Sequence, residues 1–260
     1  MIKKIIHMFT CLIKKNYNEK VSVIVPVYNV FPCYIEEALN SVLASTYQNL
    51  EIIVVNDGST NKETLSFLDS YKNKKVKIIN QINMGLAEAR NTGINSANGK
   101  YILPLDADDK IEPTYIEKAV KIIETKKKVG IVYCEADLFG AINKKWELPE
   151  FKMKNMLRFN CIFCTALFRK TDWEKVGGYK KIMKYGWEDY EFWLSLLELN
   201  LKVYRIPEIL FHYRQHEKSS MLTEIYKDNS KLEYLWKMIH TYHRDLYKKY
   251  KIDNSNLLNQ

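Results

Sequence analysis

The chain has 260 residues, with 40 lysines and arginines against 31 aspartates and glutamates, which gives a formal net charge of +9. Hydrophobic residues make up 47% and charged residues 27%, so a core can be buried and a disordered chain is excluded. The positive excess suits nucleic acid, an anionic membrane surface or a phosphorylated small molecule, and composition does not choose among them.

A basic segment opens the chain. Residues 5–13 are mainly apolar, but this stretch is shorter than the ~20 residues that cross a bilayer. Lysines flank it at positions 3, 4, 14 and 15. We expect segment 1–20 either to lie as an amphipathic helix in a membrane interface or to pack on the domain that follows.

Strand-like and helix-like patterns alternate through the first half of the chain. The alternation predicts βαβ units, and hence an α/β fold with a mostly parallel sheet flanked by helices. Ligands of such sheets bind outside the carboxyl ends of the strands, so polar residues that follow three strands should converge on one crevice. Short apolar runs predict strands at 21–28, 50–55, 75–80 and 100–105, and amphipathic spacing predicts helices at 35–44, 62–71 and 86–97.

The second half is less regular. A loop-rich basic stretch covers residues 136–160, and apolar residues recur at helical spacing over 224–250. The aromatic residues of that tail, Trp236 among them, suit either a membrane interface or packing on the domain. The remaining predictions are helices at 113–126, 171–176 and 190–199 and strands at 129–135, 161–168, 201–205 and 209–213.

The five cysteines are scattered and odd in number, so they do not form a disulfide framework, and a reducing, cytoplasmic compartment is favoured. Cys161 and Cys164 form a CxxC pair without a second pair at zinc-finger spacing. Because the pair lies in the apolar run CIFCTALF, we interpret both as buried structural residues.

Two carboxylates follow the strand at 100–105. Asp106 and Asp108 are separated by Ala107, and burying both requires a cation. Mg²⁺ or Mn²⁺ bridging to a diphosphate would supply it, because these ions favour carboxylate and phosphate oxygens. A solvated acidic turn is the alternative.

Three motifs in this order carry a resemblance to a known family. They read VSVIVPVYN at 21–29, VVNDGST at 54–60 and NMGLAEARNTGINSANGKYILPLDADD at 83–109. They resemble the nucleotide-binding half of family 2 glycosyltransferases, over about residues 20–220. The resemblance implies an inverting enzyme of the GT-A fold, with a domain at 21–220, divided into a nucleotide-sugar half (21–112) and an acceptor half (113–220), and a helical tail at 221–260.

The resemblance also assigns the donor site. A carboxylate can accept from the imide N–H of a base and a tyrosine can stack on it, so the residue types agree. The alternative role for Asp57 is to form the turn. Arg90 suits a diphosphate or a buried carboxylate, and its alternative role is a structural ion pair. The nucleotide-binding residues implied are Pro26, Tyr28, Asn29, Asp57 (on the base, usually uracil), Asn83, Gly85, Arg90, Asp106 and Ala107.

A metal site is implied at Asp108, which would hold Mn²⁺ or Mg²⁺ against the diphosphate. A histidine of the segment FHYRQH (211–216) would complete it. We prefer His216, with His212 as the alternative, although a lone histidine is usually structural or exposed. Arg214 would neutralise the departing diphosphate.

The acceptor side is implied by Trp187-Glu188-Asp189. By resemblance Asp189 is the base that takes the proton of the acceptor hydroxyl, and Glu188 orients the site. An acidic cap on the helix at 190–199 is the alternative. Gly178, Tyr179 and Trp187 are the residues implied in acceptor contacts, with a simple helix stop as the alternative at the glycines.

The sequence thus predicts a transferase that moves a sugar, as UDP-hexose or UDP-HexNAc, to a hydroxyl of a glycan or lipid-linked acceptor in bacterial polysaccharide or lipooligosaccharide synthesis. We expect it in the cytoplasm, with peripheral contact at the inner face of the cytoplasmic membrane. No nucleic-acid motif is present, so nucleic acid is not expected as a partner. The alternatives are a nucleotide-sugar-binding protein without transferase activity and a sugar nucleotidyltransferase.

Overall fold

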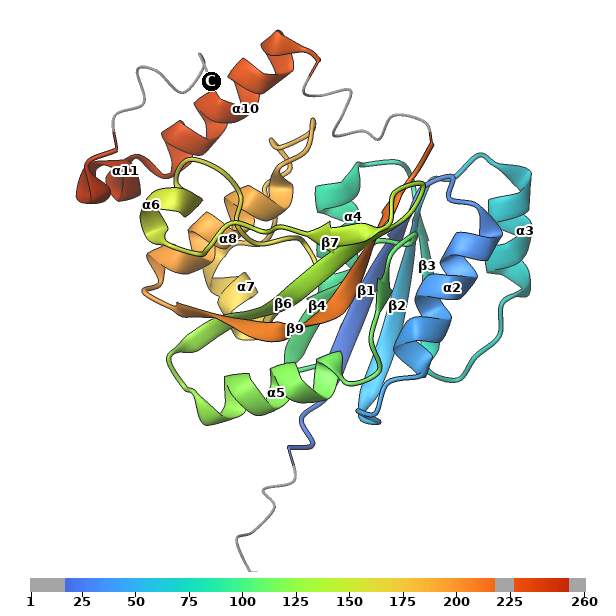
Figure 1. The fold of residues 1–260 in the computed structure, drawn as a ribbon. Coiled ribbons are helices and arrows are strands. Elements are labelled where there is room, and N and C mark those ends of the chain that lie inside the picture. Colours follow the sequence, from blue (N-terminus) through green and yellow to red (C-terminus); the bar gives the residue numbers. More distant parts are fainter. Residues whose placement is uncertain (1–16, 218–226, 253–260) are drawn as a thin grey trace, which may run out of the picture.

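The computed structural model describes residues 17–217 and 227–252 of the chain. Their architecture is an α/β fold built on one mixed sheet of nine strands (Figure 1). The strands are β1 (Val21–Val27), β2 (Leu50–Asp57), β3 (Val76–Gln81), β4 (Tyr101–Pro104), β5 (Lys110–Ile111), β6 (Val129–Gly140), β7 (Lys144–Trp146), β8 (Leu167–Arg169) and β9 (Lys202–Gln215). The helices are α2 (Pro32–Leu43), α3 (Lys62–Ser70), α4 (Leu86–Asn95), α5 (Tyr115–Thr125), α6 (Met153–Met156), α7 (Lys170–Val176), α8 (Glu188–Glu198), α10 (Asn229–Tyr242) and α11 (Arg244–Tyr250).

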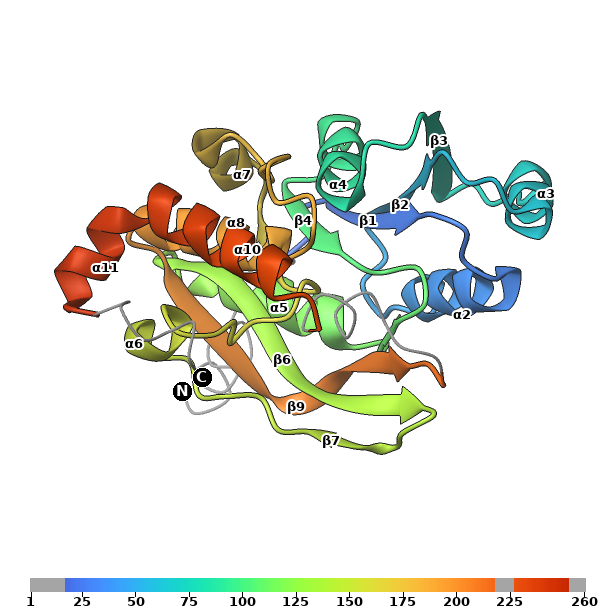
Figure 2. The ribbon, with the colours of Figure 1, turned by 90° about the horizontal axis from the view of Figure 1, so that it is seen from above.

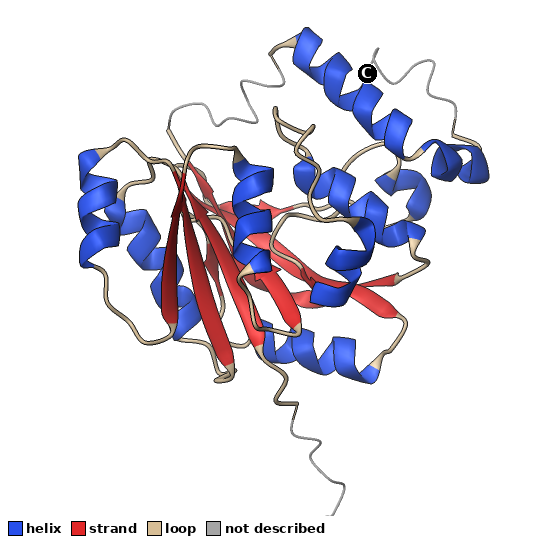
Figure 3. Ribbon diagram, turned by 180° about the vertical axis from the view of Figure 1, so that it is seen from behind, coloured by secondary structure: helices blue, strands red, loops and turns tan. Residues whose placement is uncertain are grey.

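The first half of the sheet is parallel, as the sequence predicts. Strands β3, β2, β1 and β4 lie side by side in that order, with Val21 of β1 opposite both Leu50 of β2 and Tyr101 of β4. Every residue of β1 is buried, which explains its unbroken apolar run. Helices α2 and α4 cover opposite faces of these strands (Figure 2), and the sheet seen from behind in Figure 3 lies between helical layers.

The second half departs from the sequence prediction in three places. The stretch at 136–160 is not all loop, because β6 runs to Gly140 and turns back into β7. The strands predicted at 201–205 and 209–213 are one strand, β9, which pairs in parallel with β6. The strand predicted at 161–168 is reduced to β8, which pairs with β4 and β6 in antiparallel register and joins the two halves into one sheet.

The tail helices α10 and α11 pack on α8, as Figures 1 and 2 both show. The predicted helix at 224–250 is interrupted at His243, where α10 ends. Leu235 and Ile239 are fully buried, so the apolar face of α10 covers the domain rather than facing outward. The predicted N-terminal helix falls outside the described residues. Within the described ranges no helix has the length and apolar character needed to cross a bilayer.

Candidate active site

The loops after β1 and β2 are tied together by Asn29. Its side-chain oxygen accepts from the backbone N–H of Thr60 (2.7 Å) and Asn61 (2.8 Å), and its own N–H donates to Ser59 Oγ (3.0 Å). Asn29 adopts a left-handed backbone conformation (φ 54°), which asparagine tolerates better than most residues. Asn29 therefore shapes the rim of the crevice, while Tyr28 beside it is 51% exposed and Pro26 lies buried at the end of β1.

Asp57 ends β2 and holds the loop between β3 and α4. Its carboxylate accepts hydrogen bonds from Gln81 Nε2 (2.6 Å) and from the backbone N–H of Met84 (2.8 Å) and Gly85 (2.9 Å). The side chain is 4% exposed, so most of its hydrogen-bonding capacity is used within the protein. The same loop presents Asn83, which is exposed. The contact of Asp57 with a base thus stays a prediction, whereas its role in shaping this loop is seen directly.

Arg90 of α4 connects the two chemical motifs of the sequence. Its Nη2 donates to Asp106 Oδ1 at 2.7 Å, and its Nη1 donates to Glu188 Oε1. The guanidinium is 1% exposed, and the carboxylates of Asp106 and Glu188 raise the pKa of Arg90 against the opposing effect of burial. Arg90 therefore serves as a buried cation between the acidic strand end and the start of α8.

Asp106 and Asp108 lie at the turn after β4, with Ala107 buried between them. Burial and the neighbouring Asp106 raise the pKa of Asp108. Oδ2 of Asp108 lies 2.8 Å from Nε2 of His216, and both side chains are about one-third exposed. This brings together the carboxylate and the preferred histidine of the predicted metal site.

The donor set at this position fits a divalent ion that also binds substrate. Within residues 17–217 and 227–252, no three His, Cys, Asp or Glu side chains converge as a complete metal cage. Mg²⁺ is commonly held by one or two carboxylates plus substrate phosphates, so the carboxylate of Asp108 fits such a site, and His216 would add an imidazole nitrogen beside it. Their partial exposure leaves the outer side of the site open to a diphosphate.

The other two basic candidates of the C-terminal strand are engaged elsewhere. His212 lies between Asp137 Oδ1 (2.6 Å to Nδ1) and Glu112 Oε1 (2.9 Å to Nε2). Arg214 donates from Nε to the carbonyl of Asp108 (2.7 Å) and from Nη2 to Glu37 Oε2 (2.7 Å). Arg214 thus supports the acidic turn through the carbonyl of Asp108, and with a side chain that is 9% exposed its action on the leaving diphosphate stays a prediction.

Asp189 has the electrostatic setting of a general base. It lies in the first turn of α8, where Asn160 Nδ2 donates to its Oδ2 at 3.1 Å and the Tyr190 N–H donates to its Oδ1 at 2.7 Å. Burial, and next the charge of Glu188, raise the pKa of Asp189 to about 7, against the opposing charge of Arg90. A base with a pKa near 7 is matched to proton abstraction at neutral pH.

The predicted acceptor residues divide into two groups. Gly178 (φ 73°) and Tyr179 form a turn that lies against Asn91. The backbone N–H of Tyr179 donates to Asn91 Oδ1 at 2.9 Å, and a Cβ on Gly178 would lie 2.8 Å from that same oxygen. Tyr179 is 2% exposed and the guanidinium of Arg90 lies over its ring, so the side chain packs inside the protein and its contact with an acceptor stays a prediction. Trp187 is partly exposed and precedes Glu188 and Asp189 directly.

Sequence reasoning missed two residues of this site. Cys164 was interpreted as a structural core residue, but its thiol donates to Asp106 Oδ2 at 3.3 Å and the charge of Asp189 acts on it. Asn160 was assigned to a basic loop, and it contacts Asp189. Cys161, in contrast, is buried as expected, and Cys33, Cys134, Cys161 and Cys164 are all free thiols. No local pattern marks Cys164 or Asn160, because both contacts come from chain segments distant in sequence.

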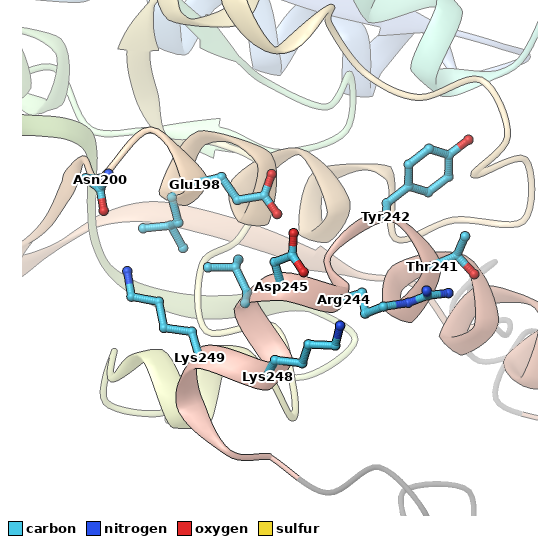
Figure 4. A pocket seen from close by; sticks show the side chains of 10 residues that line it. Glu198, Asn200, Thr241, Tyr242, Arg244, Asp245, Lys248 and Lys249 are labelled. Atoms are coloured by element: carbon cyan, nitrogen blue, oxygen red, sulfur yellow. The ribbon is translucent and has the colours of Figure 1, made fainter.

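A cavity of about 700 Å³ lies away from this acidic site, between the end of α8 and α11 (Figure 4). It contains none of the predicted site residues. Three of its lining side chains are basic, Arg244, Lys248 and Lys249, and they share it with Glu198 and Asp245.

Comparison with known families identifies the family of this chain. Residues 22–177 match the model of glycosyl transferase family 2. The chain belongs to this family. Among curated family relatives, it is 35% identical over 215 residues to an uncharacterised glycosyltransferase of Haemophilus influenzae, which covers 75% of this chain and 65% of that protein. It is 33% identical over 239 residues to an uncharacterised glycosyltransferase of Rickettsia typhi, which covers 86% of this chain and 72% of the relative. The chain thus spans about two thirds of the length of these relatives.

Solved structures agree on the GT-A fold of this family 2 glycosyltransferase. S. aureus TarS 1–349 in complex with UDP-GlcNAc superposes with a TM-score of 0.66 over 91% of this chain and 77% of that one, at 20% identity. The mannosyltransferase PcManGT from Pyrobaculum calidifontis, in complex with GDP-Man and Mn²⁺, gives a TM-score of 0.65 over 86% of this chain and 65% of that one, at 21% identity. At this identity the likeness establishes the fold.

Proposed function

We propose that this chain is an inverting glycosyltransferase that moves a sugar from a nucleotide-diphosphate sugar to a hydroxyl of a glycan or lipid-linked acceptor. The observation that carries the proposal is the pair of sites joined by Arg90. On one side Arg90 binds Asp106, which is followed by the Asp108 and His216 pair of the proposed metal site. On the other side Arg90 binds Glu188, which is followed by Asp189, whose pKa is raised to about 7 by burial and by the charge of Glu188. A binding protein that does not transfer sugar has no need of that second carboxylate.

The roles follow from this arrangement. A divalent ion, Mn²⁺ or Mg²⁺, held by Asp108 and His216 would neutralise charge on the diphosphate. Asp189 takes the proton from the acceptor hydroxyl as its oxygen forms a bond to the anomeric carbon. The bond from that carbon to the diphosphate oxygen breaks, and the nucleoside diphosphate leaves. Attack from the face opposite the leaving group inverts the anomeric centre. Arg90 holds the carboxylates of Glu188 and Asp106 in place throughout.

The donor nucleotide is proposed to lie over Tyr28, Asn29, Asn83 and Gly85, in the loops after β1 and β3, which both contact the loop after β2. UDP-hexose or UDP-HexNAc is our preferred donor class, and the structural relatives that bind UDP-GlcNAc and GDP-Man support nucleotide sugars in general. Bacterial polysaccharide or lipooligosaccharide synthesis is the proposed setting. A sugar nucleotidyltransferase is disfavoured because the loop after β1 lacks the glycine-rich turn that would hold a triphosphate.

Peripheral contact with the inner face of the cytoplasmic membrane is proposed for the tail. Arg244, Lys248 and Lys249 line the open cavity of Figure 4, where lipid phosphates could approach them. Trp236, by contrast, faces the domain, so it does not serve as a membrane anchor.

A donor screen tests the proposed function. Purified protein is incubated with UDP-, GDP- and dTDP-sugars, with and without Mn²⁺, and release of the nucleoside diphosphate is measured with water or a glycan panel as acceptor. We expect one nucleotide class to be turned over, and only with the metal. An anomeric product of retained configuration would contradict the inverting mechanism, and binding without turnover for every donor would favour the non-enzymatic alternative.

A further inference from the structure

The segment between α7 and α8 leads into the proposed base. It runs from Gly177 to Trp187, and it contains few regular hydrogen bonds of its own. Trp187, its last residue, has a left-handed backbone (φ 59°), which is unfavourable for a bulky residue. Such a conformation persists only where surrounding contacts hold it, so the contacts on this segment decide where Asp189 lies.

Helix α10 supplies those contacts. The ring of Trp236 packs edge-to-face on Trp187, with 5.0 Å between ring centroids, and also meets Tyr190 at 6.3 Å. Two residues earlier in α10, the ring of Tyr234 packs on Tyr185 at 5.3 Å, and its hydroxyl donates to the carbonyl of Ile182 at 3.0 Å. The tail helix therefore touches the segment near its middle and at its end.

A buried polar contact fixes the far end of α10 to the same helix that carries the base. Nδ1 of His243 lies 2.9 Å from Glu198 Oε1, and its Nε2 lies 3.4 Å from Glu191 Oε1. His243 and Glu191 are 1% and 0% exposed. Glu191 is in α8, two residues after Asp189, so α10 is anchored both on the base helix and on the segment before it.

We infer that α10 is a working part of the transferase site, and that Trp236 is a positioning residue that holds Trp187, and through it Asp189, in place for the acceptor. This inference rests on the proposed function for its catalytic meaning. It extends that function by placing one wall of the acceptor side in the C-terminal tail, outside residues 22–177 that match the family model.

The test compares full-length variants of α10. Trp236→Ala should raise amide hydrogen exchange in residues 179–189 and lower kcat for the donor found by the screen, by about tenfold to a hundredfold, because small displacements of a catalytic group are costly. Affinity for UDP and the KM for the donor should stay within about twofold, since the aromatic rings packed on Trp236 in the described part of the chain, those of Trp187, Tyr190 and His240, belong to no proposed donor residue. Trp236→Phe, which keeps an aromatic ring, should restore most of kcat.

Two further variants keep the inference falsifiable. Tyr242→Ala removes an aromatic residue of the same helix that is 48% exposed, and it should leave exchange and kcat unchanged. Tyr234→Phe removes only the hydroxyl and keeps the fold, and it should raise exchange near Ile182. Unchanged exchange in 179–189 together with unchanged kcat in Trp236→Ala would overturn the inference. If the wild-type protein turns over no nucleotide sugar, the proposed function fails, while the exchange measurement still decides whether α10 holds the segment.

Discussion

Asp108 and His216 are 108 positions apart in the chain, yet Oδ2 of the aspartate lies 2.8 Å from Nε2 of the histidine. The contact exists because β9 runs parallel to β6 and ends beside the turn after β4. His212, four residues earlier on β9, is held between two other carboxylates. The structure thus separates the preferred histidine of the predicted metal site from its alternative, His212.

His216→Ala should weaken Mn²⁺-dependent UDP binding. We expect a loss of at least about tenfold in affinity, which is the loss seen even when an outer partner of a metal ligand is removed. Isothermal titration with UDP, with and without Mn²⁺, measures it. His212→Ala is the matched control and should keep the metal dependence. A larger loss in His212→Ala than in His216→Ala would reverse the assignment.

Asp189→Asn should abolish most of the transfer activity while UDP still binds. Removal of a general base costs about a hundredfold to ten-thousandfold in rate. Because burial and Glu188 raise the pKa of Asp189 to about 7, the wild-type rate should rise with pH through this value as the base loses its proton. A pH–rate profile of donor turnover checks this, and a flat profile between pH 6 and 8 would contradict the assignment.

The carboxylate of Asp189 should lower the free energy of unfolding as the pH rises toward neutral. A raised pKa means that the folded protein holds the proton more tightly than the unfolded chain does, so stability falls as pH rises from about 4 to about 7. Asp189→Asn removes this loss, and its gain in unfolding free energy should be larger at pH 8 than at pH 5. Urea denaturation at both pH values measures the difference. Asp245→Asn, at an exposed position of α11, is the control for the loss of one carboxylate outside the site.

Arg90→Met should be strongly destabilising. It leaves Asp106 and Glu188 without their shared buried cation, and breaking a buried ion pair costs about 3–5 kcal/mol. Arg90→Lys should rescue little, because one ammonium cannot match the two-sided contact of the guanidinium. Lys118→Met is the control: it breaks an exposed pair with Glu208, which is worth about 1 kcal/mol or less. Equal losses in the two methionine variants would show that Arg90 is not a structural hub.

The parallel half of the fold could be predicted because its signals are local. Buried strands such as β1 have continuous apolar runs, and the polar residues at their carboxyl ends are adjacent to them in sequence. The motifs around Asp57, Asp106 and Asp189 were recognisable for the same reason. The structure shows that Arg90, for which the sequence left two interpretations open, connects the motif of Asp106 to that of Glu188 and Asp189.

The second half was predicted less well because its strands and side-chain contacts depend on segments that are distant in the sequence. The sequence predicts two strands in place of β9, because Pro207 and Glu208 interrupt the apolar run. Its register with β6 passes from Ile206 opposite Cys134 to Ile209 opposite Glu135, so the interruption is accommodated as a bulge inside one strand. Cys164 lies in an apolar run, and only the approach of β4 shows that its thiol reaches Asp106.

Gly58→Ala should disturb the nucleotide loop more than Gly85→Ala does. Both glycines have positive φ, 70° and 88°, so an alanine at either position is strained, at a cost of about 1–3 kcal/mol. A Cβ at Gly58 would in addition lie 2.6 Å from the backbone nitrogen of Asn83, whereas a Cβ at Gly85 meets nothing within 4 Å. The clash must move the loop that Asp57 holds through Met84 and Gly85. We therefore expect Gly58→Ala to lose more unfolding free energy in urea and more UDP affinity than Gly85→Ala. Equal effects on both measurements would show that the close approach at Asn83 does not set the shape of the loop.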